Sequence, residues 1–460
     1  MTRPDKGNGT VILNKSEYLD KMHSILSDTS KFTVETDDLI KLNTRLEDSV
    51  NNLILSFKKF GIHIPNDCKA TGSHPGKLYG LPKTHKANVP LRPVLSAYTT
   101  ASFNLAKYIV KLLNPIAYNE YSVKNSYDFI NDLSNFNFRN GVLVNFDVES
   151  LFTAIPVEET INIILDELFI SDDTLIENMN RKQFKRLLKV ATDNTYFLFN
   201  CTLYKQVDGM AMGSPLGPVF ANVFMNKLER EFMLHCPCDF KPKFYKRYVD
   251  DTFTIFDSHS QALKFLEYIN NRHPNIKFTV DFENNDKISF LDILIHKNET
   301  LEFSVYRKTT FTGLSINFFS FCPIIYKINA LKTLLFRSYS ICSNLMNFHK
   351  EIEFLHDLFV KNQFPLHLAQ SITKKFLNNI FSPSKAIHTV PKKDVFVSIP
   401  YFGYKSDSLK ANFSNRYLSV TYPSINFKIV LNNNLRIGSF FNCKDKTMIP
   451  LCSGVIYSYK

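Results

Sequence analysis

The hydrophobic residues of this chain follow two different spacings, which divide it into helical and extended stretches. Apolar residues at steps of three and four predict mainly helix in residues 16–60. The same spacing makes SFNLAKYIVKLLNPI (102–116) an amphipathic helix that Pro115 stops. Further helices are expected as a pair within 157–194, after an opening turn within 212–233, at 259–272 and at 324–381.

The extended stretches lie mainly in the middle of the chain. VLVNFDV (142–148) predicts a buried strand, TYFLFNCTLYKQVDG (195–209) a hairpin bent at Asn200, and FYKRYVDDTFTIF (244–256) a second hairpin. Residues 71–100 are rich in Gly and Pro, which predicts a loop followed by a short extended piece. Three strand-like pieces follow at 276–282, 287–296 and 301–308, and residues 385–460 read as mostly extended.

Composition places this pattern in a basic chain with a large core. The 460 residues are enough for two to four domains, and 44% of them are hydrophobic. Lys and Arg outnumber Asp and Glu by 55 to 43, which gives a net charge of +12. Such a charge fits a solvated basic surface, and it equally fits contact with a polyanion such as nucleic acid or an acidic membrane.

The remaining features of composition concern the cellular compartment. No apolar run approaches 18 residues, and MTRPDKGNGTVIL lacks the layout of a signal peptide. We therefore expect no membrane contact and a location in the nucleus or cytoplasm. The eight scattered cysteines predict buried free thiols in a reducing compartment and no zinc site.

Acidic residues stand at the ends of two predicted strands. Asp147 ends the run VLVNFDV, and Asp250 lies 103 residues later beside Asp251 in the bend of the second hairpin. A buried carboxylate without a partner costs several kcal/mol, so Asp147 must be exposed, paired or bound to a metal. If the two strands are neighbours, Asp147 and Asp250 can face each other, whereas Asp250 and Asp251 point to opposite faces unless the turn re-aims one.

Carboxylates that converge from two strands suit hard cations. Mg²⁺ binds one or two carboxylates, waters and phosphate oxygens, and two such ions can activate a hydroxyl and stabilise a leaving pyrophosphate. An Asp-Asp pair by itself is also what an ordinary solvated turn looks like. Its significance therefore depends on the motifs around it.

Those motifs, in their order along the chain, resemble the Penelope-like retroelement reverse transcriptases. The resemblance covers essentially the whole chain, and as an ordered set its motifs are highly specific. It is carried by RPDKGNG, YGLPKTHK, LRPVLS, NFDVESLFTAIP, GMAMGSPLGPVFAN, RYVDDTF, SFLDI and VYRKTTFTG.

The resemblance implies an α+β, right-hand polymerase fold and an RNA-directed DNA polymerase. Its substrates would be an RNA template, a DNA primer or RNA–DNA duplex, and dNTP, with two Mg²⁺ ions, or Mn²⁺ in their place; the oligomeric state stays open. The implied domains are an N-terminal and fingers region (1–140), a palm (141–310), a helical thumb (311–384) and a C-terminal extension (385–460).

The family's motifs also imply roles for individual residues. Asp147 and Asp250 would hold the metals with the Val148 carbonyl, and Asp251 is the less certain third carboxylate. Phe152 would lie beneath the incoming sugar and exclude a 2′-hydroxyl. The residues implied in contacts with the incoming nucleotide are Arg92, Lys83, the weaker candidate Lys86, Gln206, and the loop of Gly209, Gly213, Ser214 and Pro215. Arg307 and Lys308 would contact primer phosphates.

For each of these residues an ordinary structural role is the competing interpretation. Phe152 can be a core residue, and the basic fingers segment can be a solvated loop. The 211–215 segment can be a plain helix start, and the basic residues of 324–381 can form the solvated face of a bundle. Asp292 has no evident chemical role and is expected to cap a turn or form a salt bridge.

Two departures from the family pattern stand out. Relatives commonly carry a C-terminal GIY-YIG endonuclease, whereas PLCSGVIYSYK is followed by no such motif, so we expect that this chain does not nick DNA. Cys322 stands where the family often has His. Two other functions stay open: a catalytically inactive nucleic-acid-binding remnant of a retroelement, and a telomerase-like enzyme, although no long RNA-binding region precedes the palm.

Overall fold

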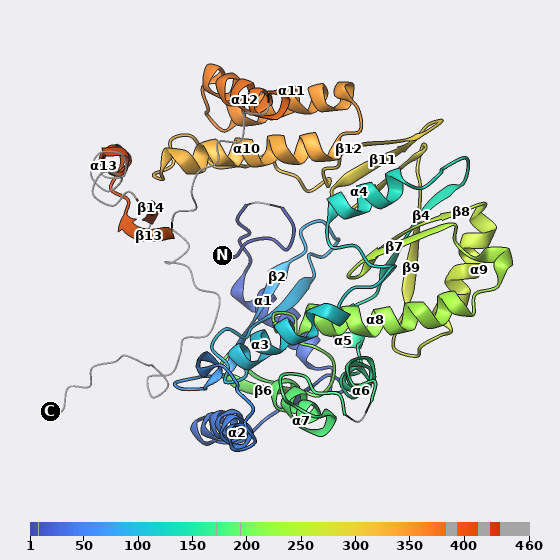
Figure 1. The fold of residues 1–460 in the computed structure, drawn as a ribbon, viewed down its shortest axis with the longest axis vertical. Coiled ribbons are helices and arrows are strands. Elements are labelled where there is room, and N and C mark those ends of the chain that lie inside the picture. Colours follow the sequence, from blue (N-terminus) through green and yellow to red (C-terminus); the bar gives the residue numbers. More distant parts are fainter. Residues whose placement is uncertain (8, 172, 194, 383–392, 413–423, 433–460) are drawn as a thin grey trace.

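A four-stranded antiparallel sheet, ordered β7-β8-β4-β9, lies on the right of the molecule in Figure 1. The structure is a computed structural model and describes residues 1–382, 393–412 and 424–432, except 8, 172 and 194. The sheet consists of β4 (Val142–Val148), β7 (Phe244–Tyr248), β8 (Asp251–Phe256) and β9 (Phe278–Phe282). The strand predicted at 142–148 and the hairpin predicted at 244–256 are thus confirmed, and they are neighbours.

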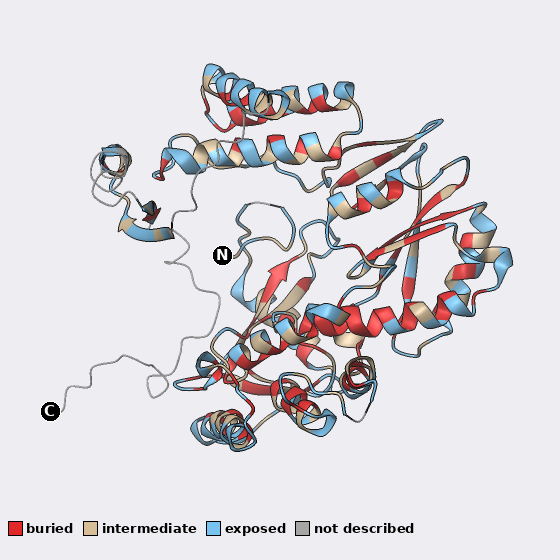
Figure 2. Cartoon of the chain, viewed as in Figure 1, coloured by how far each residue is buried: buried red, intermediate tan, exposed pale blue. Residues whose placement is uncertain are grey.

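Both faces of this sheet are covered, because its strands are apolar on both sides. Val144 and Phe146 of β4 pack with α8 (Gly217–Leu234) and α9 (His259–Asn270) on one face. Leu143 packs on the other face with α4 (Ser126–Ser134) and with a three-stranded sheet. Helix α8 is buried nearly all round, as Figure 2 shows, because it lies between the core of this sheet and a second core formed by other helices.

A five-stranded sheet, ordered β1-β6-β5-β2-β3, lies beside the first. Residues 71–100 contain the hairpin of β2 (Gly76–Pro82) and β3 (Leu91–Ser96), so the prediction of a loop with one short extended piece was incomplete. Pro93 is compatible with a strand here because β3 is at the edge of the sheet. The other strands are β1 (Phe32–Val34), β5 (Tyr196–Phe199) and β6 (Thr202–Gln206), and the last two form the hairpin predicted around Asn200.

Helices cover the five-stranded sheet and join it to the first. The helix expected over 16–60 is two helices, α1 (Lys15–Leu26) and α2 (Leu39–Lys59), separated by β1. Asp38 caps α2 by accepting a hydrogen bond from the Lys41 amide at 2.9 Å, which fixes where the second helix begins. Three further helices match the expected ones: α3 (Phe103–Leu113), α6 (Val157–Leu168) and α7 (Arg181–Thr192). The short helix α5 (Leu151–Ala154) was not predicted.

The piece expected as one strand over 287–296 is a hairpin. It forms β10 (Lys287–Phe290) and β11 (Ile293–Lys297), which pair with β12 (Leu301–Val305) in a three-stranded sheet. Leu291, at φ 56°, makes the turn between them. The buried residues shift from even positions (288, 290) to odd ones (293, 295), a break in period that a single flat strand cannot have.

Three helices follow and confirm the predicted helical segment: α10 (Ile324–Ile341), α11 (Leu345–Lys361) and α12 (Leu366–Phe381). They form a bundle above the two larger sheets (Figure 1). Beyond it, β13 (Lys393–Pro400) and β14 (Ile425–Asn432) pair in parallel, with α13 (Tyr404–Asn412) between them in sequence. The predicted strands of the tail are confirmed only there, and the final stretch PLCSGVIYSYK lies outside the described residues.

Two predictions from composition can be compared with the described part of the chain. Cys68, Cys236 and Cys322 are buried thiols, as expected, whereas Cys201 and Cys238 are exposed and Cys342 is half-buried, contrary to the prediction. No helix in the described ranges is both long and apolar enough to cross a membrane.

Candidate active site

The three aspartates meet at one end of the four-stranded sheet. In the antiparallel pairing of β4 with β8, Asp147 lies directly opposite Asp251. The Val148 amide donates to the Asp250 carbonyl at 3.1 Å, which closes the turn between β7 and β8 against the end of β4. Residues 103 positions apart in sequence are therefore neighbours. Asp251, the less certain carboxylate in the sequence, is the direct cross-strand partner.

The carboxylates repel one another in a partly desolvated cleft. Asp147 keeps contact with solvent, but burial by the cleft walls, followed by the charges of Asp250 and Asp251, raises its pKa to about 6. The pKa of Asp251 is also raised, first by burial and then by Asp250. Lys6 offsets both shifts and Lys308 offsets the second. Such a cluster gains free energy from a bound cation.

The donor set fits a divalent ion that substrate helps to hold. No three His, Cys, Asp or Glu side chains in the described ranges are arranged as a complete metal cage. Mg²⁺ is commonly bound by one or two carboxylates together with waters and substrate phosphates, so a complete protein cage is not required. Cross-strand carboxylates with raised pKa values, next to the Val148 carbonyl, match that kind of site.

The cleft at the carboxylates has a volume of about 370 Å³. Its floor includes Asp147 and Asp251, and Lys308 lies on its wall, whereas Asp250 lies in the turn beside it. A volume in this range accommodates a small ligand. The other polar side chains of the lining are Lys6, His85, Asn145, Asp281, Ser289, Tyr306, Thr309 and Thr310.

A buried ionic network, which the sequence did not reveal, holds the turn that carries the aspartates. Val249 has φ 57°, a left-handed conformation that is strained for a β-branched residue. Arg247 is fully buried and donates to the Val249 carbonyl at 3.0 Å. It also pairs with the fully buried Glu229 of α8, Nε to Oε1 at 2.6 Å and Nη2 to Oε2 at 3.1 Å.

Two asparagines of α8 complete this network. Arg247 Nη1 donates to Asn222 at 3.0 Å, and Nη2 donates to Asn226 at 2.9 Å. All five guanidinium donors thus have partners, which is what a buried charge requires. The sequence signal was a Glu and two Asn on one mostly apolar helix, with an Arg one position before the YVDD bend.

The predicted basic residues of the fingers gather on the β2–β3 hairpin. Lys83 follows β2, and Arg92 lies on β3. Burial, with the charges of Arg92 and Lys86, lowers the pKa of Lys83, so these cations lie close together. Arg92 Nη1 pairs with Asp5 at 3.1 Å; the Asp5 side chain is 3% exposed and that of Arg92 41%.

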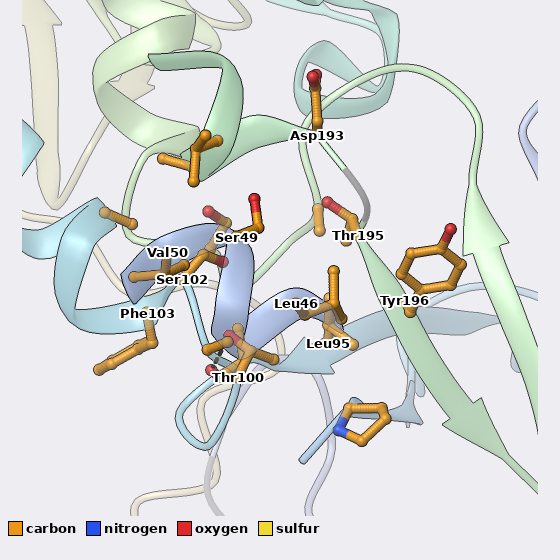
Figure 3. Close-up of a pocket in the computed structure, with 18 of the residues that line it drawn as sticks. Leu46, Ser49, Val50, Leu95, Thr100, Ser102, Phe103, Asp193, Thr195 and Tyr196 are labelled. Atoms are coloured by element: carbon orange, nitrogen blue, oxygen red, sulfur yellow. Dashed lines mark hydrogen bonds between the residues drawn. The ribbon is translucent and has the colours of Figure 1, made fainter. Parts of the chain in front are cut away.

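The 211–215 loop backs onto β3 and the core. Gly213 has φ 121°, and a Cβ there would lie 1.9 Å from the Leu95 carbonyl oxygen, so only glycine fits. Ser214 lines a second cavity of about 60 Å³, shown in Figure 3 with Leu95 and Thr195 on its walls. This cavity is too small for a nucleotide and shares no lining residue with the carboxylate cleft.

Phe152 and Gln206 are the other predicted nucleotide contacts, and they lie on different elements. Phe152 is half-buried in α5, its carbonyl accepts from the Met210 amide at 2.7 Å, and its ring lies against Gly217. Gln206 ends β6, and its side chain donates to the Asp208 carbonyl at 3.0 Å. The structure thus brings Phe152, but not Gln206, against the start of α8.

Arg307 and Lys308 differ although they are adjacent. Arg307 forms a bidentate pair with Glu351 of α11 and stacks on Phe354, with its guanidinium carbon 3.8 Å from the ring centroid. A primer contact by Arg307 would require this pair to open. Lys308 is exposed and faces Asp251.

Asp292 makes the salt bridge that the sequence suggested. Its carboxylate accepts from Ser126 of α4 and pairs with Arg337 of α10 at 2.6 Å. It therefore ties the helical bundle to α4 and to the turn between β10 and β11 of the three-stranded sheet.

Solved structures similar to this chain are polymerases. A telomerase from Candida albicans in complex with a TWJ fragment of telomeric RNA is 13% identical, with a TM-score of 0.47 over 71% of this chain and 63% of that one. A telomerase from Candida tropicalis with the same kind of RNA is 14% identical, with a TM-score of 0.43 over 80% and 59%. The BmCPV RNA-dependent RNA polymerase is 13% identical, with a TM-score of 0.36 over 75% and 31%. No curated protein matches.

Two family models match the sequence. That of the animal helix-turn-helix domain matches residues 314–374, which span α10, α11 and the first half of α12. That of reverse transcriptase (RNA-dependent DNA polymerase) matches residues 82–316, which contain the three aspartates. The fold is accordingly the right-hand polymerase fold. Because the second match spans more than half of the 460 residues, the chain belongs to the reverse transcriptase family.

Proposed function

We propose that this chain is an RNA-directed DNA polymerase of a Penelope-like retrotransposon, which adds dNTPs to a primer 3′-hydroxyl on an RNA template. One observation carries the proposal: within the matched family region, Asp147 lies opposite Asp251 while Asp250 lies in the adjoining turn. The ordered motifs of the sequence support the Penelope-like subtype. The net charge of +12 supports binding of a polyanion.

In this proposal Asp147 and Asp250 hold two Mg²⁺ ions with the Val148 carbonyl, and Asp251 completes the acidic cluster. The ions would supply activation of the hydroxyl and stabilisation of the pyrophosphate that leaves. The chain's own part is to fix the carboxylates in place. The strained Val249 turn, held by Arg247, serves that purpose.

The other proposed roles are contacts with the triphosphate, the sugar and the primer. Arg92 and Lys83 receive the triphosphate, since a guanidinium offers a bidentate fork to phosphate oxygens. Phe152, on α5 and against the start of α8, supports the sugar, and Gly213 and Ser214 belong to the loop that leads into α8. Lys308, exposed beside Asp251, is well placed for a primer phosphate near the reacting end. Gln206 and Arg307 are the weakest of these proposals because their side chains already have internal partners.

Primer extension on an RNA template tests the proposal. We expect Mg²⁺-dependent incorporation of dNTPs that Asp250→Asn abolishes. Asp48→Asn is the matched control, because Asp48 is exposed on α2 and remote from the cleft. Extension that survives Asp250→Asn would contradict the metal assignment.

The second candidate function is a nucleic-acid-binding remnant without catalysis, which the basic charge alone would support. Such a protein binds RNA with an affinity that falls steeply as salt rises, and incorporates no nucleotide with any divalent metal. Salt-dependent binding together with no incorporation under Mg²⁺ or Mn²⁺ would select it.

A further inference from the structure

The N-terminal motif RPDKGNG borders the carboxylate cleft, and Lys6 of the motif lines it. Residues 2–11, described apart from residue 8, form a turn closed by paired hydrogen bonds between Thr2 and Val11, at 2.9 and 2.7 Å. The Asp5 amide donates to the Pro82 carbonyl at 2.9 Å, which attaches the turn to the end of β2. Figure 1 shows this segment in dark blue, beside β2 and below α10.

Gly7 lets the turn touch the opposite wall of the cleft. It has φ +81°, and a Cβ there would lie 2.8 Å from the carbonyl oxygen of Thr310, which follows β12. Any other residue would strain the backbone and collide with main chain. The motif therefore spans the opening between the β2–β3 hairpin and the segment that leads to the thumb.

Asp5 and Lys6 of this turn point to different groups. Asp5 is nearly buried and pairs with Arg92, the proposed triphosphate ligand. Lys6 is exposed and lines both the cleft at the carboxylates and the adjoining opening of about 750 Å³. Its charge acts on Asp147 and Asp251 on one side and on Lys83 on the other.

We propose that the turn is part of the nucleotide site: Lys6 contacts the β- and γ-phosphates of the incoming nucleoside triphosphate, and Asp5 is a positioning residue that orients Arg92 toward them. The proposal rests on the proposed function for the identity of the ligand. The phosphates must lie between the carboxylates that hold the ions and the cations of the hairpin. Lys6 lines the cleft with Asp147 and Asp251, and its neighbour Asp5 pairs with Arg92 of the hairpin, so the turn reaches both groups.

An equilibrium binding measurement tests the role of Lys6 without requiring turnover. Binding of Mg²⁺–dATP and of Mg²⁺–pyrophosphate to the full chain is compared for Lys6→Ala, Lys6→Arg and the control Lys15→Ala. Lys15 is an exposed lysine at the start of α1 that takes no part in the cleft. Since a charged phosphate contact is lost, we expect both dissociation constants to rise about tenfold for Lys6→Ala. Lys6→Arg should restore most of the affinity, and Lys15→Ala should change nothing.

Primer extension with the same variants separates this proposal from the proposed function. We expect Lys6→Ala to raise the KM for dNTP about tenfold and to leave the KM for primer–template unchanged. Unaltered binding of both ligands would overturn the Lys6 proposal while leaving the polymerase intact. Tighter ligand binding or faster extension by Lys6→Ala would also overturn the Lys6 proposal, because Lys6 would then obstruct the nucleotide site. A wild-type chain that binds dATP through Lys6 but extends no primer would refute only the proposed function.

Asp5 is tested by its dependence on Arg92. Asp5→Asn keeps the shape of the side chain and removes the charge, so we expect a weaker affinity for dATP in the wild-type background. In an Arg92→Ala background the same change should have no further effect, because there is no guanidinium left to orient. Equal effects in both backgrounds would show that Asp5 acts on the fold alone. Thermal unfolding of each variant identifies any that lose the fold.

Discussion

Two hairpins face each other across the cleft, and they are held in very different ways. The β7–β8 turn carries Asp250 and is held by the guanidinium of Arg247, which is 0% exposed and makes five hydrogen bonds. The β2–β3 hairpin carries Arg92, whose side chain is 41% exposed and pairs with Asp5. The turn that carries Asp250 is thus held by a fully buried network, whereas Arg92 is held by a single ion pair and keeps contact with solvent.

The difference matches what each side would have to do. Carboxylates that hold two ions must stay fixed to within a fraction of an ångström, so a strained turn locked by a buried network is suitable. Cations that receive and release a triphosphate at each cycle must be able to move. A half-exposed pair permits such motion, because exposed ion pairs stabilise by about 1 kcal/mol or less.

The largest expected effect comes from breaking the buried anchor. Arg247→Met leaves Glu229 as a buried charge without its partner, so we expect a loss of about 3–5 kcal/mol in the free energy of unfolding. Urea denaturation measures it. Arg45→Met is the matched control, since Arg45 is exposed and pairs with Asp37 at 3.4 Å, and should cost less than about 1 kcal/mol.

A double variant separates stability from turn geometry. Arg247→Met with Glu229→Met replaces the whole ion pair by apolar groups, which is often close to neutral for stability. We expect part of the stability to return, since Asn222 and Asn226 still lose their donor. Primer extension should stay low, because nothing then holds the Val249 carbonyl. Full recovery of extension would show that the network serves stability only.

The next largest effect is expected in the pH dependence of metal binding at Asp147, on the carboxylate side of the cleft. The pKa of Asp147 is about 6 in the folded chain, above its ordinary 3.8, so the folded state binds this proton more tightly than the unfolded state does. The metal-free protein therefore gains stability from this group as the pH falls through 6, and lacks that gain at neutral pH.

A cation competes for the same carboxylate, so added Mg²⁺ should raise the Tm more at pH 7.5 than at pH 5. Below pH 6 the affinity for metal should fall by about tenfold per pH unit, as one proton is displaced. Differential scanning fluorimetry with and without Mg²⁺ measures the shift. A Tm gain that does not depend on pH would contradict the involvement of Asp147.

The smallest effect on stability is expected on the fingers side. Arg92→Lys keeps the charge and loses the forked geometry, so we expect the KM for dNTP to rise about tenfold, with the free energy of unfolding changed by less than about 1 kcal/mol. Steady-state extension and urea denaturation of the same preparation give both numbers. A large loss of stability would show that this hairpin is anchored as firmly as the other.

Most elements of the fold could be predicted from the sequence because their hydrophobic periods are regular. The strand before Asp147 and the YVDD hairpin are runs of apolar and β-branched residues bounded by polar turns. The turn at Leu291 was missed although the phase of the buried residues changes there. The β2–β3 hairpin was missed because Gly and Pro, which usually signal loops, occur here in an edge strand.

The site was less predictable than the fold, because it depends on contacts between distant segments. Motif order pointed to the three aspartates, and the register of β4 with β8 brought them together. No local pattern announces that Arg247 lies beneath the turn, that Asp5 pairs with Arg92 from 87 residues away, or that Arg307 pairs with Glu351. These partners are chosen by tertiary packing.

The central claim is that the aspartates jointly hold two divalent ions, and counting those ions tests it most directly. Mn²⁺ binding is followed by electron paramagnetic resonance, with a primer that lacks a 3′-hydroxyl, its RNA template and dNTP present. We predict two ions per chain for the wild type, fewer for Asp147→Asn and for Asp250→Asn, and two for Asp48→Asn. An unchanged count in both cleft variants would contradict the account.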